Sequence, residues 1–344
     1  MSLATKYRPT TFEEVCGQNI TTTILKRVVE NKSFKNCYIF SGTSGCGKTT
    51  CARIFANLIN GGIGEPIEVD AASNSGVDNV RSMVDSANQR SLTGEYKVFI
   101  IDECHSLTSQ AWQAFLKGIE ECPKYTIFIF CTTEPQKLPA TILNRMQRYT
   151  FAPISSTDIQ ARLEYICQAE GFVNYTDTCS FISKIANGGM RNAISYLEQC
   201  ADFSTDLSLD NAKQVLRGLS YESAFRLTWA IRDGSEANII SLLDSLVNEG
   251  QDLKHFIDWY LEFVLNLIKY VLFQDVSITI IPAYLATPEN DVLQYTVSMD
   301  NCLNRLNYLV DSLLEIKSLI KYDSNYVSTV QVMLLKVART FSSI

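Results

Sequence analysis

The stretch Gly42-Thr-Ser-Gly-Cys-Gly-Lys-Thr-Thr50 has the spacing G-x-x-x-x-G-K-[ST], which is the pattern of a phosphate-binding loop. In such a loop successive backbone N–H groups surround the phosphates, and the following helix points its positive end at the same anion. We expect Lys48 to reach the β- and γ-phosphates and the Thr49 hydroxyl to bind Mg²⁺. The pattern therefore predicts a nucleotide-binding domain.

The sequence on both sides of this loop has the strand and helix that such a loop requires. Cys37-Tyr-Ile-Phe40 is an apolar run typical of a buried strand, and residues 50–59 have the period of an amphipathic helix. A chance glycine-rich turn is the alternative interpretation, and these flanks disfavour it.

Composition limits the class of protein. A chain of 344 residues has room for two or three domains, and 46% hydrophobic with 19% charged residues is ordinary for a soluble globular protein. There is no run of about 18 apolar residues and no secretory signal, so we expect a cytoplasmic protein without a membrane contact. Eleven cysteines without a C-x-x-C pair, beside two histidines, favour buried thiols in a reducing compartment over disulfides or zinc.

The net charge of −7 is unevenly distributed. Residues 1–152 contain 16 Lys and Arg against 14 Asp and Glu, a net of +2, whereas the remaining residues contain 14 against 23, a net of −9. The acidity therefore belongs to the C-terminal part, and a basic surface for nucleic acid remains open on the N-terminal part.

Apolar runs and helical periods alternate up to about residue 151. Strands are predicted at 37–41, 67–70, 97–102, 126–132 and 148–151, with helices near 19–31, 48–60, 76–90 and 108–121. This alternation predicts a parallel, doubly wound sheet. Beyond it we predict three short helices within 155–201 and long helices over 207–344, with a less regular segment at 276–286.

A second nucleotide signal follows the loop by about fifty residues. In Lys97-Val-Phe-Ile-Ile-Asp-Glu-Cys-His105 a buried strand ends in two carboxylates, at the edge where ligands bind in open α/β sheets. Asp102 is expected in the Mg²⁺ shell, and Glu103 is expected to orient or deprotonate the attacking water. His105 is interpreted as a loop or packing residue.

Two further polar positions have weaker signals. Thr133 follows the strand 126–132 and is placed to contact the γ-phosphate or the water, whereas Arg145 further on is either functional or a plain surface charge. Arg191 follows a glycine pair in the first turn of a predicted helix, where a cation is unfavourable against the helix dipole. A phosphate facing Arg191 would explain its position, and a solvated arginine is the alternative.

Taken together, the chain resembles the gamma/tau ATPase subunits of the bacterial DNA polymerase III clamp loader, within the AAA+ superfamily. The resemblance covers roughly residues 4–200, and the C-terminal part matches only in position, length and helicity. The matching segments, in family order, are Lys6-Tyr-Arg-Pro-Thr-Thr-Phe-Glu-Glu-Val-Cys-Gly-Gln18, Phe40-Ser-Gly-Thr-Ser-Gly-Cys-Gly-Lys-Thr-Thr50, Glu68-Val-Asp-Ala-Ala-Ser73, Ile101-Asp-Glu-Cys-His105, Thr132-Thr-Glu-Pro-Gln-Lys-Leu-Pro139 and Gly189-Met-Arg191.

The resemblance implies a fold class and a function. It implies an α/β P-loop AAA+ domain with a parallel sheet over 1–152, a small three-helix lid over 153–205 and an all-α collar for oligomerisation over 206–344. In such a clamp loader ATP binding closes a ring of subunits and opens a sliding clamp, and primer–template DNA triggers hydrolysis and clamp release. The implied partners are the clamp, the other subunits of a pentamer and DNA, in a bacterial or phage-infected cell.

The resemblance also assigns roles to residues. The implied catalytic set adds sensor 1 (Thr133), the lid arginine of sensor 2 (Arg191) and an arginine that acts in trans (Arg145) to Lys48, Asp102 and Glu103. Mg²⁺ would be held by Thr49 and, through water, by Asp102. ATP would be bound by Arg8, Pro9, Val15, Cys16, Gln18, Thr43, Ser44, Gly45, Cys46, Gly47, Lys48, Thr49, Thr50, Met190 and Arg191.

Three departures from the family pattern stand out. The family's Ser-Arg-Cys is Asn144-Arg145-Met146 here, which keeps the charge in a changed setting. The zinc-binding cysteines expected after the P-loop helix are replaced by Asn60-Gly-Gly-Ile-Gly-Glu-Pro66, so no zinc is predicted. The extension of the long family form is expected to be absent.

Contacts with DNA and clamp are implied more weakly. The turn before the helix near Val77 suits a phosphate, and its DNA-binding candidates are Ser73, Asn74, Ser75, Gly76 and Arg81. Gly76 stands where relatives often have a lysine, and an ordinary helix cap with a surface arginine is the alternative. For the clamp, the candidates are Gln110 and Trp112 on the helix after the Asp-Glu strand, whereas Phe115 and Leu116 are expected in the core.

Two other functions are kept as alternatives. One is a structural clamp-loader subunit that binds nucleotide without hydrolysing it. The other is a different AAA+ DNA motor, such as a branch-migration helicase, which the acidic C-terminal part disfavours.

Overall fold

The computed structural model describes residues 2–91, 93–216, 221–274 and 289–341, so the predicted irregular segment 276–286 lies outside the described residues. The chain divides into two compact units, Met1–Leu209 and Asp210–Ile344. The first unit contains both the predicted P-loop domain and the predicted lid. Their boundary at residues 152 and 153, like that of the collar at 206, stays a prediction.

The first unit is built on a five-stranded sheet in which all neighbouring strands are parallel, in the order β2-β3-β4-β1-β5. This confirms the predicted parallel sheet. The first strand ends one residue later than expected, and the last begins one residue earlier. The strands are β1 (Cys37–Gly42), β2 (Ile67–Asp70), β3 (Lys97–Asp102), β4 (Thr126–Thr132) and β5 (Gln147–Phe151).

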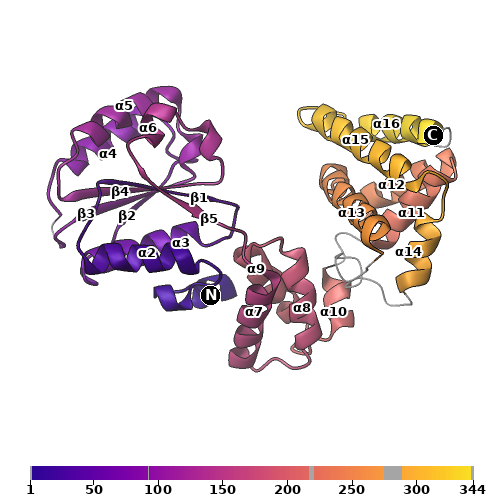
Figure 1. The fold of residues 1–344 in the computed structure, drawn as a ribbon, viewed down its shortest axis with the longest axis horizontal. Helices are drawn as coiled ribbons and strands as arrows, with labels where there is room; N and C mark the ends of the chain where they lie inside the picture. The colour runs from indigo at the N-terminus through magenta and orange to yellow at the C-terminus, as the bar shows by residue number, and fades with distance from the viewer. Residues whose placement is uncertain (1, 92, 217–220, 275–288, 342–344) are drawn as a thin grey trace. The chain divides into compact units, whose positions relative to one another are not determined.

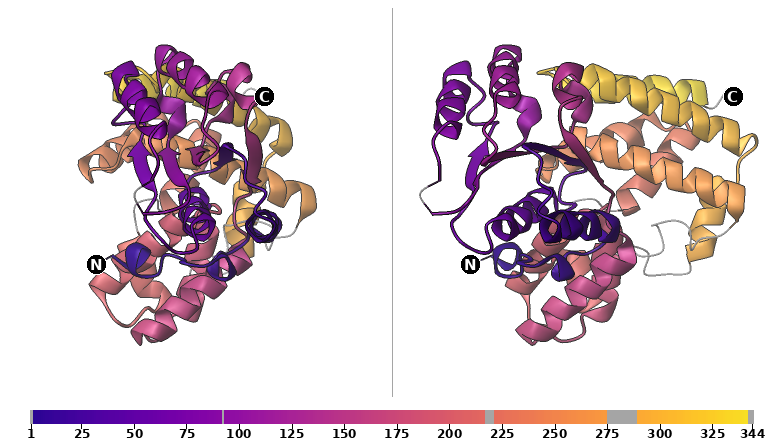
Figure 2. Two further views of the ribbon diagram at one scale, coloured as in Figure 1. Left: turned by 90° about the vertical axis from the view of Figure 1, so that its left-hand side faces the viewer. Right: turned by 60° about the vertical axis from the view of Figure 1, so that its left-hand side comes forward.

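Helices cover both faces of this sheet, with α2 and α3 on one face and α4, α5 and α6 on the other (Figures 1 and 2). Side chains alternate between the two faces along each strand. Tyr38 and Phe40 pack with Phe55 of α3, whereas Phe128 and Phe130 pack with the opposite helices. The helices are α2 (Asn19–Glu30), α3 (Lys48–Ile59), α4 (Val77–Ala87), α5 (Ser109–Glu120) and α6 (Ala140–Leu143).

The core between the sheet and helices α4, α5 and α6 contains Trp112, which was predicted to contact a clamp. Trp112 on α5 is only 3% exposed, and its ring centroid lies 5.6 Å from that of Phe130 and 6.0 Å from that of Phe115. The side chain points at the sheet, so the prediction that Trp112 contacts a clamp is wrong. Gln110 is exposed on the same helix, and its clamp contact stays a prediction.

Three helices complete the first unit, as predicted: α7 (Ser156–Glu170), α8 (Thr176–Ile185) and α9 (Met190–Phe203). They enclose a small apolar core of their own, with Ile159, Leu163 and Leu197 fully buried. The short N-terminal helix α1 (Leu3–Lys6) packs against α9, and the Leu3 N–H donates to Glu198 Oε1 at 2.8 Å. The chain's first residues are therefore fixed to the three-helix lid.

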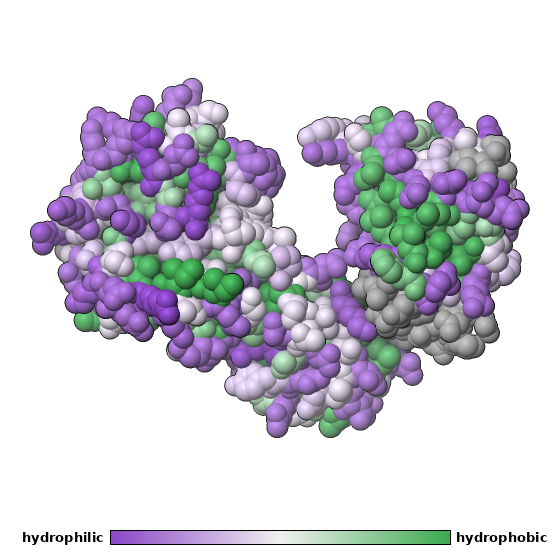
Figure 3. All heavy atoms as spheres, in the orientation of Figure 1, coloured by the Kyte–Doolittle hydropathy of each residue, from purple (hydrophilic) through white to green (hydrophobic). Residues whose placement is uncertain are grey.

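In its described residues the second unit has helices joined by short loops and no strand, in agreement with the sequence. Its core contains Phe256, Tyr260 and Phe263, and the buried Tyr260 hydroxyl lies 2.9 Å from Thr228 Oγ1. At the end of its longest helix Leu272 and Phe273 are 57% and 66% exposed, and Figure 3 shows apolar side chains gathered on this unit. The helices are α10 (Leu209–Val215), α11 (Tyr221–Arg232), α12 (Glu236–Asn248), α13 (Leu253–Phe273), α14 (Glu289–Val297), α15 (Cys302–Ile320) and α16 (Tyr326–Phe341).

Across the described residues, no helix combines the length and apolarity that crossing a membrane requires. All eleven cysteines are free thiols and eight are buried, as the composition predicts. Burial raises the pKa of the Cys51 thiol to about 12 and that of Cys122 to about 11, so these thiols stay protonated at neutral pH.

Candidate nucleotide-binding and hydrolysis site

The P-loop connects the end of β1 to the first turn of α3. Gly47 caps α3 in a left-handed conformation with φ of 101°, which is unfavourable for other residues. Because this cap has no side chain to accept from the first-turn N–H groups, those donors stay available for an anion. The loop therefore has the local geometry of a phosphate site.

Lys48 is the buried cation of this loop, with 6% of its surface exposed. Its ammonium donates to the carbonyl oxygens of Gly42, at 3.0 Å, and Thr43, at 2.8 Å. Both partners are neutral, so the ammonium charge lacks the anion that normally compensates a buried cation. A phosphate bound in the loop would supply that charge.

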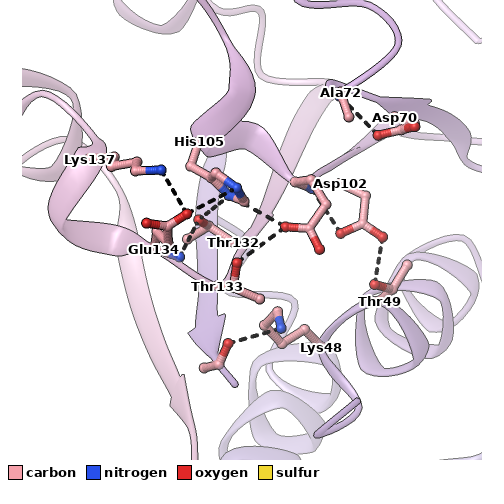
Figure 4. Close-up of polar contacts among 12 residues, drawn as sticks. Lys48, Thr49, Asp70, Ala72, Asp102, His105, Thr132, Thr133, Glu134 and Lys137 are labelled. Atoms are coloured by element: carbon pink, nitrogen blue, oxygen red, sulfur yellow. Dashed lines mark hydrogen bonds and ion pairs between the residues drawn. The ribbon is translucent and has the colours of Figure 1, made fainter. Parts of the chain in front are cut away.

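Thr49, in the first turn of α3, contacts Asp102, the last residue of β3 (Figure 4). The Thr49 hydroxyl donates to Asp102 Oδ2 at 2.8 Å, and Asp102 Oδ1 accepts the Glu103 N–H at 3.0 Å. A hydroxyl and a carboxylate are hard oxygen ligands, and Mg²⁺ is usually bound by one or two such groups together with substrate phosphates and water. The pair therefore fits Mg²⁺. Within the described ranges no group of three or more His, Cys, Asp and Glu side chains forms a metal cage.

Glu103 has an unusual backbone conformation for a residue with a side chain. Its φ of 47° lies in the left-handed region, which costs of order 1–3 kcal/mol for a non-glycine residue. Directly after it the chain forms the short helix η2 (Cys104–Ser106). The Thr133 hydroxyl donates to Glu103 Oε2 at 3.4 Å, so the structure brings these two predicted catalytic residues together.

The lid reaches the P-loop through the first residues of α9. The Met190 N–H donates to the Gly45 carbonyl oxygen at 3.0 Å. A Cβ atom on Gly45 would lie 3.2 Å from Gly189 Cα and 3.4 Å from Arg191 Cβ, so the approach depends on a bare Cα. Arg191 lies in the first turn of α9, as predicted, and is exposed.

A cleft of about 250 Å³ opens between the P-loop, the N-terminal segment and the lid. It brings together most of the predicted ATP-binding and catalytic residues, from segments up to 183 positions apart in the chain. Those lining it are Arg8, Pro9, Val15, Cys16, Ser44, Gly45, Cys46, Gly47, Lys48, Thr49, Thr50, Asp102, Glu103, Met190 and Arg191.

Gln18 is not among the lining residues, so the structure does not place it where the resemblance implies, in contact with ATP. Its side chain is 4% exposed, and Nε2 donates to the carbonyl oxygens of Ala152, at 2.7 Å, and Cys46, at 3.3 Å. It connects the P-loop to the end of β5 from beneath. Thr43 and Thr133 are also absent from the lining; the Thr43 carbonyl oxygen accepts from Lys48, and the Thr133 hydroxyl donates to Glu103.

The cleft also contains residues that the sequence analysis missed, including Tyr7, Ile154, Arg162 and Ile194. Arg162 Nη2 donates to the Tyr7 carbonyl oxygen at 2.9 Å, and the Lys6 ammonium lies 2.6 Å from Glu170 Oε1. The hydrogen bond from Lys6 holds the pKa of Glu170 below its ordinary value. Arg162 lies on an ordinary amphipathic helix, so no local signal distinguishes it from a solvated arginine.

Arg145 lies outside this cleft and is exposed. Its guanidinium forms an ion pair with Glu120 at 2.6 Å and donates to the Thr141 carbonyl oxygen at 2.7 Å. It is therefore not placed on the nucleotide site of its own chain.

The predicted DNA-binding turn is organised around Asp70. Asp70 accepts from the Ala72 N–H at 2.9 Å (Figure 4). It also accepts from the Ser73 hydroxyl at 2.9 Å, and its carbonyl oxygen accepts from Asn74 Nδ2 at 3.0 Å. Arg81 is exposed, 3.4 Å from Asp78 Oδ1. Hydrogen bonds within the turn after β2 account for the contacts of Asp70, and the DNA contacts of Ser73, Asn74, Ser75, Gly76 and Arg81 stay predictions.

The sequence of this chain is similar to those of DNA polymerase III subunits. A family model described as DNA polymerase III, delta subunit, matches residues 65–155. DNA polymerase III subunit tau of Bacillus subtilis strain 168 is 35% identical over 286 residues, which cover 77% of this chain and 51% of that protein. DNA polymerase III subunit gamma/tau of Mycoplasma genitalium is 31% identical over 296 residues, which cover 79% and 50%. The chain spans about half the length of the curated relatives it matches.

Similar solved structures include the Thermotoga maritima RuvB Holliday junction branch migration motor. It is 16% identical, with a TM-score of 0.53, and the match covers 72% of this chain and 86% of that one. At this identity the likeness shows a shared fold alone. Over about three quarters of its length, the chain belongs to the family of DNA polymerase III gamma/tau subunits.

Proposed function

We propose that this chain is the ATPase subunit of a sliding-clamp loader that acts in DNA replication. The observation that carries the proposal is the single cleft where the P-loop, the Asp102–Glu103 end of β3 and Arg191 of the lid meet. The names of the relatives, DNA polymerase III tau and gamma/tau subunits, support the replication role. ATP binding would close the ring of subunits and open the clamp, and primer–template DNA would trigger hydrolysis and clamp release.

The polar residues in and beside the cleft have separate roles in this scheme. Lys48 would exchange its two carbonyl partners for the β- and γ-phosphates of ATP. Thr49 and Asp102 would hold Mg²⁺, which offsets phosphate charge when bound. Glu103 would orient the attacking water and take up its proton, and Thr133 would hold Glu103 beside the γ-phosphate.

Two arginines would complete the site from different directions. Arg191 would contact the phosphates from the lid of the same chain, whereas Arg145 would reach the ATP of a neighbouring subunit. The Arg145–Glu120 ion pair is 42% and 47% exposed, and such pairs contribute about 0–1 kcal/mol, so Arg145 can exchange this partner at little cost. An arginine finger supplies ~10³–10⁵ in rate, which makes hydrolysis a property of the assembly.

The remaining contacts belong to the same proposal. The second unit would form the collar of a pentamer with other clamp-loader subunits, with its exposed apolar side chains, such as Phe273, available for contacts. Gln110 would contact the clamp, and the turn at 73–76 with Arg81 would contact DNA phosphates. The assembly would work in the cytoplasm of a bacterial or phage-infected cell.

Clamp loading by a Glu103→Gln variant tests this proposal. The assembled complex is given ATP, clamp and circular primed DNA, and the clamps left closed on DNA after removal of the loader are counted. We expect the variant to bind ATP and clamp but to leave few released clamps. Unchanged loading would instead identify a structural subunit that does not hydrolyse ATP. Branch migration by the wild-type chain would identify a different AAA+ motor.

A further inference from the structure

We propose that His105 is a positioning residue that holds the carboxylate of Glu103 for hydrolysis, an inference that rests on the proposed function. His105 lies in η2, and its side chain is 15% exposed. The ring nitrogen Nδ1 lies 3.4 Å from Glu103 Oε2 and 3.1 Å from Thr132 Oγ1. The edge of the ring that carries Nδ1 is thus directed at Glu103, the expected general base.

The other ring nitrogen also lies near a carboxylate. Nε2 lies 3.5 Å from Glu134 Oε1, and the same oxygen lies 2.8 Å from the ammonium of Lys137. Glu134 is fixed by its backbone as well, because its N–H donates to Thr132 Oγ1 at 3.0 Å. Figure 4 shows the resulting row of side chains, from Lys137 through Glu134 to His105, beside the ends of β3 and β4.

Glu103 needs such support. Its side chain is 40% exposed and has three rotatable bonds, so the carboxylate loses entropy when it is held in one orientation. The Thr133 hydroxyl contacts the same Oε2 atom at 3.4 Å. Thr133 and His105 together fix one oxygen and leave Oε1 for the water. Catalytic hydrogen bonds commonly shorten when substrate binds, so a separation of 3.4 Å is within reach of one.

A residue that merely fills space would not use both ring nitrogens. Here His105 orients the base Glu103, and Glu134 orients His105 in turn, as in other activated catalytic sites. The side chains facing the ring are Glu103, Thr132 and Glu134, with Lys137 one contact further away. Loss of His105 should therefore slow the chemical step and leave ATP binding unchanged.

Two substitutions separate positioning from packing. His105→Leu removes both nitrogens, whereas His105→Asn keeps an N–H donor near the position of Nδ1. In the assembled, clamp- and DNA-stimulated complex we expect His105→Leu to lower kcat roughly 10-fold, a part of the ~10²–10⁴ that general base catalysis contributes. His105→Asn should retain most of the activity, with the Kd for ATP unchanged in both. His255→Asn, at an exposed position on α13, is the matched control.

Combining Glu103→Gln with His105→Leu distinguishes positioning of the base from a purely structural role of His105. When Glu103→Gln has removed the base, His105→Leu should cause little further loss, because the two residues act as one unit. Losses that multiply would contradict positioning. Wild-type turnover in His105→Leu, in a complex that hydrolyses ATP, would overturn the inference and leave the proposed function intact.

Nitrogen spectra of the imidazole rings test the contacts without any turnover. The chain has two histidines, so a long-range ¹H–¹⁵N spectrum of the full chain contains two ring systems, and His255→Asn identifies the second. We expect Glu103→Gln to shift Nδ1 of His105 and Glu134→Gln to shift Nε2. Unchanged resonances in both variants would refute the contacts, even if the complex proves not to hydrolyse ATP.

Discussion

Gln18→Leu tests how the P-loop is held in place. The change keeps the size of the side chain but removes the Nε2 donor, which bonds the carbonyl oxygens of Ala152 and Cys46 in a buried position. A lost intramolecular hydrogen bond costs about 1 kcal/mol, and a buried polar group left without a partner costs about 1–3 kcal/mol. The bond to Ala152, at 2.7 Å, is the stronger one. We therefore expect the free energy of unfolding of the first unit to fall by about 2–3 kcal/mol.

This loss should be visible in thermal unfolding. For a unit of about 200 residues, 1 kcal/mol shifts Tm by roughly 2–4 °C, so the expected decrease is about 4–12 °C. Since the second hydrogen bond from Gln18, at 3.3 Å, ends on the P-loop at Cys46, the Kd for ATP should rise as well. Ile20→Ser, at a neighbouring position that is 79% exposed, is the control and should leave both values unchanged. A Gln18→Leu variant that melts with the wild type would refute the reasoning.

Three other substitutions test separate parts of the account. Trp112→Ala should destabilise the chain by about 3–5 kcal/mol, as expected for a buried aromatic residue, whereas Gln110→Ala should leave Tm unchanged; a stable Trp112→Ala variant would contradict the core position. Gly45→Ala should destabilise by about 1–2 kcal/mol through its left-handed backbone and should also weaken ATP binding at the lid contact. Gly171→Ala is the control, because Gly171 has a φ of 76° and an added Cβ there would meet nothing within 4 Å. This control should lose stability but keep its affinity for ATP. Equal ATP affinity in the Gly45→Ala and Gly171→Ala variants would refute the contact between Gly45 and the lid. Arg145→Ala should leave ATP binding to the isolated chain unchanged but lower hydrolysis in the complex by ~10³ or more, whereas Arg148→Ala should not; equal rates would exclude a role in trans.

The sequence was sufficient to predict the sheet and most of the cleft, because both depend on local patterns. Apolar runs place the five strands within a residue of their ends, and the P-loop and the Asp102–Glu103 pair occur at strand ends that a parallel sheet brings to one edge. The strand order was not predictable in this way, since it depends on contacts between distant segments.

The errors have a common physical cause, which is that a sequence does not show which way an amphipathic face points. Trp112 and Phe115 share one face of α5, and only the packing on Phe130 shows that this face is buried. Gln18 follows the segment that lines the cleft, yet its side chain turns beneath the loop. His105 was interpreted as a loop or packing residue, and its contacts were not predictable because Glu103 and Glu134 come from two strand ends.

The rate of ATP hydrolysis by the assembled complex tests the central claim most directly. The rate is measured for the complex alone, then with a sliding clamp, and then with clamp and primer–template DNA. A clamp-loader ATPase predicts that the rate rises at each addition and that Glu103→Gln abolishes the rise. A rate that stays constant through both additions in the fully assembled complex would contradict the account.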